Sequence, residues 1–304
     1  MIPLYWWEGY GGPRTVLSRL GRGQHPYVQN FGDLLSPFIV SSMAGRSVRY
    51  SLKPGKLLAL GSILSALSSG DRVWGSGFLS SDHIRFAVAQ NHVRYHAVRG
   101  PQTRSLLTRH GLDCPEVYGD PALLLPRFVK DDVVRSHRLG FIPHFSHARH
   151  FRKQSIDPAL RMIDVEQPVA EVVRAILSCE VVLSTSLHGL IVAEAYGRPA
   201  LLLVQQQPLQ GDLLKFRDYF EATNRDLVYE PYDANLSRLV ERALAQGPPV
   251  IDLDPLESAF PCGITPVAGG LSPDRLELPG WSTFRMPTYP TGIGLSRWVQ
   301  SVES

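Results

Sequence analysis

The sequence predicts an α/β fold in which two parallel-sheet domains face each other across a cleft. Short apolar runs of strand character alternate with helix-like runs along most of the chain, and Gly-rich or polar turns separate them. This alternation occurs in two successive sets, which is the order expected of two βαβ-based units. The length of 304 residues, of which 44% are hydrophobic and 19% charged, is sufficient for two domains.

Strands are expected in short apolar runs of the first half, each of which ends in a polar or Gly-rich turn. These runs are residues 56–64, 71–79, 93–100 and 115–126. A helix is expected over residues 101–111, because Pro101 suits a first helical turn and Gly111 suits the position after a last one. The segment YGDP at 118–121 is expected to form an Asp-Pro turn.

The same alternation restarts in the second half. Its expected elements are strands at 138–145 and 161–165, a helix at 168–180, a strand, helix and strand within 181–204, and helices within 208–223 and over 233–247. After about residue 262 the chain is rich in Pro and Gly and shows no periodicity. We therefore expect an N-terminal domain over residues 1–130, a C-terminal domain over 131–261 and a loop-like extension over 262–304.

The composition argues against several classes of protein. The formal net charge of +3 is too small for the dense basic surface of a nucleic-acid-binding protein. The three cysteines are far apart and show neither a disulfide framework nor a zinc-binding spacing, which fits a reducing cytoplasm. The N-terminus lacks the pattern of a signal peptide, and no apolar run is long enough for a transmembrane helix.

The segment from residue 181 to 204 carries the most informative turn. Its strand-like run stops at Ser184, and a Thr-Ser-Leu-His-Gly turn leads into a helix-like run. Ser184, Thr185 or Ser186 can cap that helix, whose free N–H groups and dipole favour a phosphate or carboxylate. His188 would lie in the first turn beside such an anion. The alternative is a capped helix with a histidine that only packs.

Four other polar residues occupy similar places in the predicted fold. Asp33 follows a Gly turn, Arg99 and His144 stand at strand ends, and Lys215 lies in the segment LLKFRDYF. Ligands of open α/β sheets bind where loops leave the carboxyl ends of strands, and a guanidinium such as that of Arg99 can hold a carboxylate through two hydrogen bonds. Taken singly, each also has a structural explanation: Asp33 as a helix cap, for example, or Lys215 as a solvated side chain.

An ordered series of motifs adds a resemblance to these observations. The series is WW, NFGDLLSP, GS with VWGSG, AVRGPQTR, EVYGDPALLLP, IPHF, STSLHGLIVAEAYGRPA and KFRDYF. In this order it resembles the polysaccharide pyruvyl transferase family, and most closely the ketal pyruvate transferases of exopolysaccharide assembly, such as those for xanthan and succinoglycan. The resemblance covers roughly residues 4 to 260, and the extension lies outside it.

The resemblance implies a fold similar to GT-B glycosyltransferases, with two Rossmann-like domains of which the first binds the acceptor and the second the donor. It implies phosphoenolpyruvate as donor substrate, no further cofactor and no metal. The acceptor would be a hexose in a lipid-linked oligosaccharide, for which undecaprenyl diphosphate is the usual bacterial carrier. The product would be a cyclic pyruvate ketal that bridges two hydroxyl groups of that hexose.

The resemblance also gives the candidate residues their roles. Ser186, Leu187 and His188 would bind the donor through the helix N-terminus, and Arg99 and Lys215 would neutralise its charge. The reaction needs a general acid for the methylene carbon of the donor and a base for the sugar hydroxyl.

His188 is the first acid–base candidate and His144 the second. Asp33 would orient an acceptor hydroxyl or serve as the base.

A lipid-linked acceptor implies attachment at the membrane surface. The chain has no expected membrane span, so we expect a cytoplasmic protein at the inner face of the plasma membrane. The basic run over residues 144–153 would meet the diphosphate or anionic headgroups, or it is a solvated loop.

Two rival functions stay open at this point. One is a GT-B glycosyltransferase with a nucleotide-sugar donor, because EAYGRP at 194–199 resembles the segment by which such enzymes hold the donor sugar, and Glu194 would then be a donor ligand. The other is a non-enzymatic scaffold subunit of a polysaccharide assembly complex. The many polar residues at strand ends disfavour a scaffold.

Overall fold

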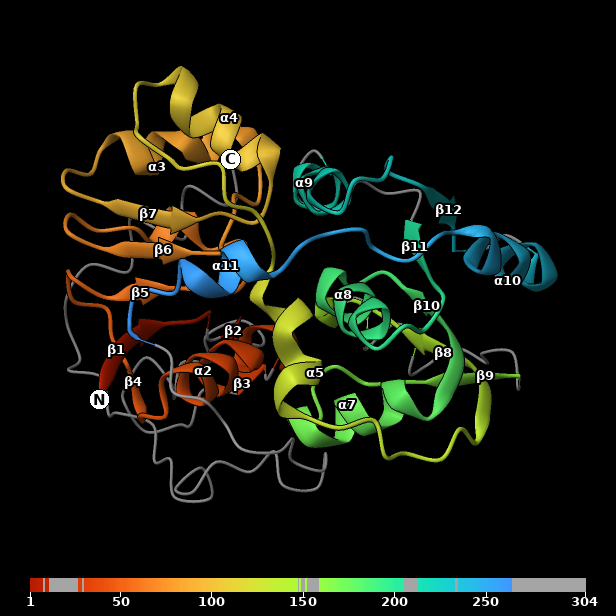
Figure 1. Cartoon of the computed structure of the whole chain (residues 1–304). Coiled ribbons are helices and arrows are strands. Elements are labelled where there is room, and N and C mark those ends of the chain that lie inside the picture. Colours follow the sequence, from red (N-terminus) through yellow and green to blue (C-terminus); the bar gives the residue numbers. More distant parts are fainter. Residues whose placement is uncertain are drawn as a thin grey trace, which may run out of the picture.

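A computed structural model describes residues 1–7, 9–10, 27–28, 30–146, 148, 151, 159–204, 213–232 and 235–263. These residues form two five-stranded sheets in which every pair of neighbouring strands is parallel (Figure 1). The prediction of an α/β fold is therefore confirmed, and the two sheets are consistent with two Rossmann-like units. The specific GT-B arrangement stays a prediction.

The first sheet is built from the first hundred residues. Its order is β4 (Val48–Tyr50), β1 (Ile2–Tyr5), β5 (Leu57–Leu58), β6 (Arg72–Trp74) and β7 (Arg94–Ala97). The helical segments around it are α2 (Phe31–Ala44), η1 (Leu64–Ala66), η2 (Ser81–His83), α3 (Ile84–Val88) and α4 (Pro101–Arg109). A short antiparallel pair, β2 (Gly9–Tyr10) with β3 (Tyr27–Val28), lies outside the sheet.

The second sheet follows the same plan. Its order is β12 (Tyr229–Pro231), β11 (Ala200–Val204), β10 (Cys179–Ser184), β8 (His137–Ile142) and β9 (Leu160–Met162), and its helices are α7 (Val169–Leu177), α8 (Leu187–Ala195), α9 (Leu214–Ala222) and α10 (Leu236–Ala245). Successive side chains of β10 alternate between two cores: Val182 packs with residues of α7 and α8, whereas Val181 and Leu183 pack with Leu239 of α10. Burial on both faces explains why these strands are almost continuously apolar.

The connection between the two sheets differs from the prediction. Residues 115–126 contain only a single parallel bridge, between Val98 and Tyr118, and then the short helices η3 (Pro121–Leu124) and α5 (Leu125–Phe128). The predicted strand is wrong because Asp120 accepts a hydrogen bond from the Ala122 N–H and Pro121 occupies the first helical position, so the backbone turns there.

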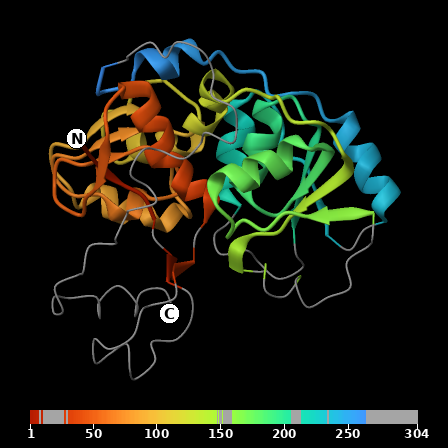
Figure 2. The ribbon, with the colours of Figure 1, turned by 90° about the horizontal axis from the view of Figure 1, so that it is seen from below.

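The chain returns to the first sheet after α10. This return segment (residues 246–263) contains α11 (Asp254–Ser258) and crosses back over the first half, as Figure 2 shows. The buried Trp74 donates its Nε1–H to the Leu256 carbonyl at 2.7 Å, and its ring meets Phe260 edge-on at 4.8 Å. The structure thus places the end of the range assigned to the second domain against the first sheet. The boundary near residue 130 stays a prediction.

Two further expectations from the sequence concern a membrane span and the C-terminal extension. No helix in the part of the chain that the structure describes is long and apolar enough to cross a membrane. The Pro/Gly-rich extension lies outside the described residues from 264 onward, as does most of the basic run after Ser146.

Candidate functional site

The hydroxyl-rich turn between β10 and α8 forms the predicted helix cap. Ser186 is the N-cap residue, and its Oγ accepts a hydrogen bond from the Gly189 N–H at 3.4 Å. Ser184 also stabilises the turn, because its Oγ accepts a hydrogen bond from the Ser186 N–H at 3.0 Å. The first-turn N–H groups of Leu187 and His188 have no carbonyl one turn earlier in the helix. They are the groups that an anion at this terminus would meet.

The start of α2 lies against the start of α8. A Cβ atom on Gly32 would lie 2.2 Å from Nδ1 of His188, so the imidazole rests directly on the backbone of the α2 first turn. The Phe31 N–H of the same turn donates to the carbonyl of Val165, in the second half of the chain, at 3.0 Å. Two helix N-termini, one from each half, therefore converge on His188.

Asp33 also belongs to this first turn of α2, and its side chain is 7% exposed. The amide of Asn30 donates to its Oδ2 at 2.6 Å. Burial raises the pKa of Asp33 to about 6, against the opposing effects of His188, the Asn30 hydrogen bond and Lys215, and Asp120 adds to the increase. A carboxyl group with such a pKa exchanges its proton near neutral pH, as a general base requires.

Asp120 completes this group from the connection between the two halves. Its Oδ2 lies 3.7 Å from Nε2 of His188. Its other oxygen, Oδ1, accepts from the Ala122 N–H at 3.0 Å and caps η3. From the sequence, this position predicted only an Asp-Pro turn; the available signal was that Asp120 lies within EVYGDPALLLP, one of the motifs of the ordered series.

Lys215 enters the same group from α9. Burial lowers its pKa to about 8, the positive charge of Arg99 lowers it further, and the charge of Asp33 opposes both. Its ammonium lies 5.0 Å from the centre of the Phe216 ring. Lys215 is the half-buried cation of the group.

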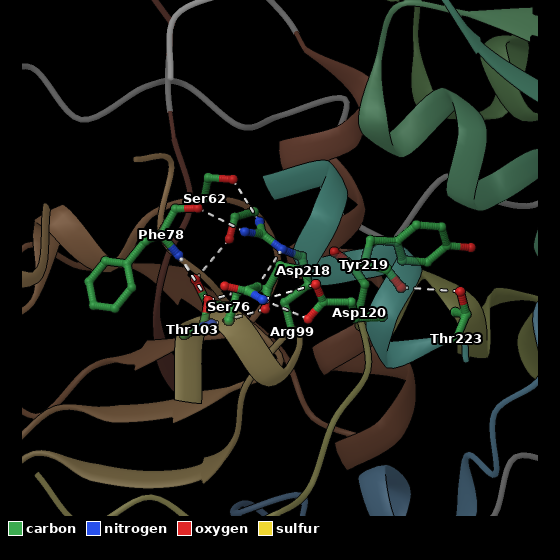
Figure 3. A network of polar contacts seen from close by, with 12 residues as sticks. Ser62, Ser76, Phe78, Arg99, Thr103, Asp120, Asp218, Tyr219 and Thr223 are labelled. Carbon is green, nitrogen blue, oxygen red and sulfur yellow. Dashed lines mark hydrogen bonds and ion pairs between the residues drawn. The ribbon is translucent and has the colours of Figure 1, made fainter. Parts of the chain in front are cut away.

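Arg99 is placed differently from a ligand-binding guanidinium. It is fully buried and donates to Asp218 Oδ2 at 3.2 Å, to Ser62 Oγ at 2.7 Å and to the Phe78 carbonyl at 2.7 Å (Figure 3). The Thr103 hydroxyl also donates to Asp218, at 2.6 Å. The structure therefore shows Arg99 as a fixed internal charge held by other parts of the protein.

Glu194 is also held by protein partners. Arg225 contacts both of its carboxylate oxygens, at 2.7 and 2.8 Å, and the Tyr219 hydroxyl donates to it at 2.5 Å. The side chain is 6% exposed. This carboxylate joins α8 to α9 and is not presented as a ligand for a sugar.

His144 lies after the end of β8, on the other side of the cap. Its backbone N–H donates to Thr185 Oγ1 at 2.7 Å, and its Nδ1 pairs with Ser146 Oγ at 2.8 Å. The adjacent Phe145 ring lies 4.4 Å from the imidazole and 5.0 Å from the ring of Trp7, in the first half. His144 is thus tied to the same turn as His188, while Asp33, Asp120 and Lys215 gather on the α2 side.

The described residues contain no group of three His, Cys, Asp or Glu side chains placed to hold a metal ion.

Comparison with known proteins relates part of the chain to a described family. Residues 67–206, a little less than half of the chain, match the model of the family described as polysaccharide pyruvyl transferase. This match supports the resemblance seen in the motifs. It contains Arg99, Asp120, His144 and His188, whereas Asp33 and Lys215 lie outside it.

A curated relative is an uncharacterized protein of Acanthamoeba polyphaga mimivirus. It is 27% identical over 168 residues, which are 53% of this chain and 57% of the relative. The chain thus spans less than two thirds of the length of that relative.

The buried ion pair predicts a large effect of Asp218→Asn on stability. The substitution leaves the guanidinium of Arg99 without its charge partner, which costs about 3–5 kcal/mol for a buried pair. Denaturant unfolding followed by circular dichroism measures the loss. The matched control is Glu171→Gln, which breaks the exposed Arg174 pair and should change the unfolding free energy by less than about 1 kcal/mol. Equal effects of the two variants would contradict the assignment.

The contact between α2 and His188 predicts that Gly32→Ala inactivates without unfolding. Alanine in a helix normally stabilises by about 0.5–1 kcal/mol relative to glycine, but here its methyl group would displace the imidazole. We expect a lower melting temperature, because overpacking a buried contact costs about 1–3 kcal/mol, in a protein that stays folded, and a loss of turnover of at least about tenfold. Gly247→Ala, where nothing lies near the added methyl group, is the control. A fully active Gly32→Ala protein would show that the imidazole does not lie there.

Proposed function

We propose that this protein transfers pyruvate from phosphoenolpyruvate to a hexose of a lipid-linked exopolysaccharide repeat unit and forms a cyclic ketal. The observation that carries the proposal is the convergence of the capped α8 N-terminus and His188 with Asp33 and Lys215. It joins an anion-binding terminus and a histidine with a carboxyl group and an amine whose pKa values are shifted to about 6 and about 8. The family match over residues 67–206 supports the same reaction class.

The donor carries a phosphate and a carboxylate, and the group offers partners for both. The backbone N–H groups of Leu187 and His188, beside the Ser186 cap, would hold one anionic group at the positive end of α8. Lys215 would meet the other. Arg99 would act through its charge, from its buried position against Asp218.

The chemistry balances without a further reactant. Protonation of the methylene carbon of the donor makes C2 electrophilic, and a sugar hydroxyl adds to C2 and loses its proton. The bond from C2 to the phosphate oxygen then breaks, and phosphate leaves with the bonding electron pair. The second hydroxyl adds to C2, closes the ketal and loses its proton. Of the two hydroxyl protons, one replaces the proton given to the methylene carbon and one leaves on phosphate.

The acid and base roles follow from where the groups lie. His188 is the first candidate for the acid, because it sits at the anion-binding terminus itself. Asp33 is the base candidate, since its raised pKa lets it accept a proton from a hydroxyl. His144, tied to the same turn through Thr185, is the second acid–base candidate.

The acceptor would reach the site from a membrane surface. A cytoplasmic protein that lies against the inner leaflet would meet a hexose on undecaprenyl diphosphate without entering the lipid. Basic residues of the 144–153 segment would contact the diphosphate or anionic headgroups.

The two shifted groups predict a bell-shaped pH dependence of kcat/KM. As a base, Asp33 must be ionised, so the rate rises through about pH 6; as a donor-binding cation, Lys215 must be charged, so the rate falls above about pH 8. Lys215→Arg should keep activity and move the alkaline limb upward, because an arginine stays charged. An alkaline limb that stays in place in Lys215→Arg would exclude Lys215 as its source. Circular dichroism at each pH separates titration from unfolding.

A thermal-shift titration tests the donor. Phosphoenolpyruvate should raise the melting temperature, because a ligand that binds only the folded state stabilises it, by about 2.7 kcal/mol at a hundred times its Kd. His188→Ala and Lys215→Ala should reduce the shift, and Lys130→Ala, an exposed lysine at another place, should not. A shift with a UDP- or GDP-sugar and none with phosphoenolpyruvate would reject the proposal in favour of a nucleotide-sugar glycosyltransferase.

A further inference from the structure

We propose that Asp120 is a positioning residue that holds the Nε2 proton of His188 and so makes Nδ1 the nitrogen that exchanges a proton with the donor. This inference deepens the proposed function and rests on it. The two side chains come from different halves of the chain, Asp120 from the connection before η3 and His188 from the first turn of α8. Neither the family match nor the motifs assign a role to Asp120.

One polar atom of each side chain lacks a hydrogen-bond partner, and this is the first observation that supports the inference. Oδ2 of Asp120 and Nε2 of His188 are buried, have no hydrogen-bond partner and lie 3.7 Å from each other. Several other buried carboxylates accept hydrogen bonds from a cation, as Asp71 does from Lys56, Asp218 from Arg99, and Glu230 from Arg238 and Arg242. A buried polar group without a partner is unfavourable by about 1–3 kcal/mol, so the two atoms gain free energy when they approach to hydrogen-bond distance.

The Asp120 carboxylate is fixed in the orientation that this use needs. Its Oδ1 is occupied by the Ala122 N–H, and the following Pro121 restricts the backbone. The short helix η3 packs against both α2 and α8. Oδ2 is consequently the oxygen left to face the imidazole, and a shift of less than 1 Å would bring the 3.7 Å separation to hydrogen-bond length. Catalytic hydrogen bonds often tighten in this way when the substrate binds.

The second ring nitrogen of His188, Nδ1, is the one left to exchange a proton with the donor. Nδ1 is the nitrogen that Asp120 does not face, and the backbone of Gly32 covers only its α2 side, where a Cβ would lie 2.2 Å away. The charged groups that face His188 are Asp33 from α2 and Asp120 from η3, and Lys215 of α9 is coupled to Asp33. A carboxylate on one ring nitrogen fixes both the tautomer and the orientation of a catalytic histidine.

The proton-transfer step follows from this arrangement. The imidazolium of His188 gives its Nδ1 proton to the methylene carbon of the donor, whose π electron pair forms the new C–H bond. The ring stays on Asp120 through Nε2–H as a neutral imidazole, and Asp120 stays ionised. A sugar hydroxyl, as its oxygen bonds to C2, returns a proton to Nδ1.

Asp120→Asn tests the inference, because an asparagine keeps the Oδ1 cap on η3 and removes only the charge. We expect kcat to fall by about 10²–10⁴-fold, the range of general acid–base catalysis, with the KM for phosphoenolpyruvate changed no more than a few-fold. Asp120→Glu should recover part of the rate. The matched control is Asp71→Asn, a buried carboxylate that pairs with Lys56 and should lower stability but leave kcat near the wild-type value.

Imidazole ¹⁵N chemical shifts of His188, assigned with His188→Gln, give a readout that does not depend on turnover. The wild-type protein should show the neutral ring protonated at Nε2, and Asp120→Asn should reduce that population. A ring protonated at Nδ1 in the wild type would overturn the inference even if no Asp120 variant folds. A folded Asp120→Asn protein with wild-type kcat would overturn it as well. Absence of pyruvyl transfer by the wild type with every acceptor would reject the proposed reaction, and the ¹⁵N shifts would still decide the Asp120–His188 pair.

Discussion

The buried ion pair between Arg99 and Asp218 fixes where the two halves of the molecule meet. Arg99 follows β7 of the first sheet, and Asp218 lies on α9, which follows β11 of the second sheet. Both side chains are fully buried. The backbones approach closely because residue 100 is glycine: a Cβ there would lie 1.9 Å from the Asp218 carbonyl oxygen. Two desolvated charges stabilise only in good geometry, so any sliding of α9 along α4, its neighbour in Figure 1, would leave a charge unpaired.

The candidate site inherits its geometry from this junction. Lys215 lies three residues before Asp218 on α9, on the same face of the helix, so the ion pair that anchors the helix also positions the lysine. The hydrogen bond from Phe31 to Val165 and the contact of Gly32 with His188 fix α2 against α8 in the same way. A rigid junction suits proton transfer, in which a displacement of about 1 Å reduces the rate substantially.

The sequence predicted the local features of this arrangement and missed the long-range ones. The strands, α8 and its Ser186 cap follow from apolar runs and from hydroxyl side chains next to the N–H groups they accept from, so neighbouring residues suffice to predict them. Arg99 appeared to be a free strand-end cation because its partner is 119 residues away and lies within a helix. The apolar run LLLP suggested a strand, but Asp120 and Pro121 start a helical turn. The contact between Asp120 and His188 forms only when the two halves pack against each other, so the local sequence does not predict it.

Burial at the junction gives the site its opposing proton affinities. Desolvation disfavours the charged form of any group, so it raises the pKa of Asp33 and lowers that of Lys215, and the two values approach neutral pH from opposite sides. An anionic donor beside them would stabilise the charged lysine and disfavour the ionised carboxyl, so the bound donor itself would favour uptake of protons. The proposed reaction begins with protonation of the donor and ends with deprotonation of a hydroxyl. The buried acid–base cluster would take up protons when the donor binds and release them as phosphate leaves. This order matches the order of the two proton transfers in the reaction.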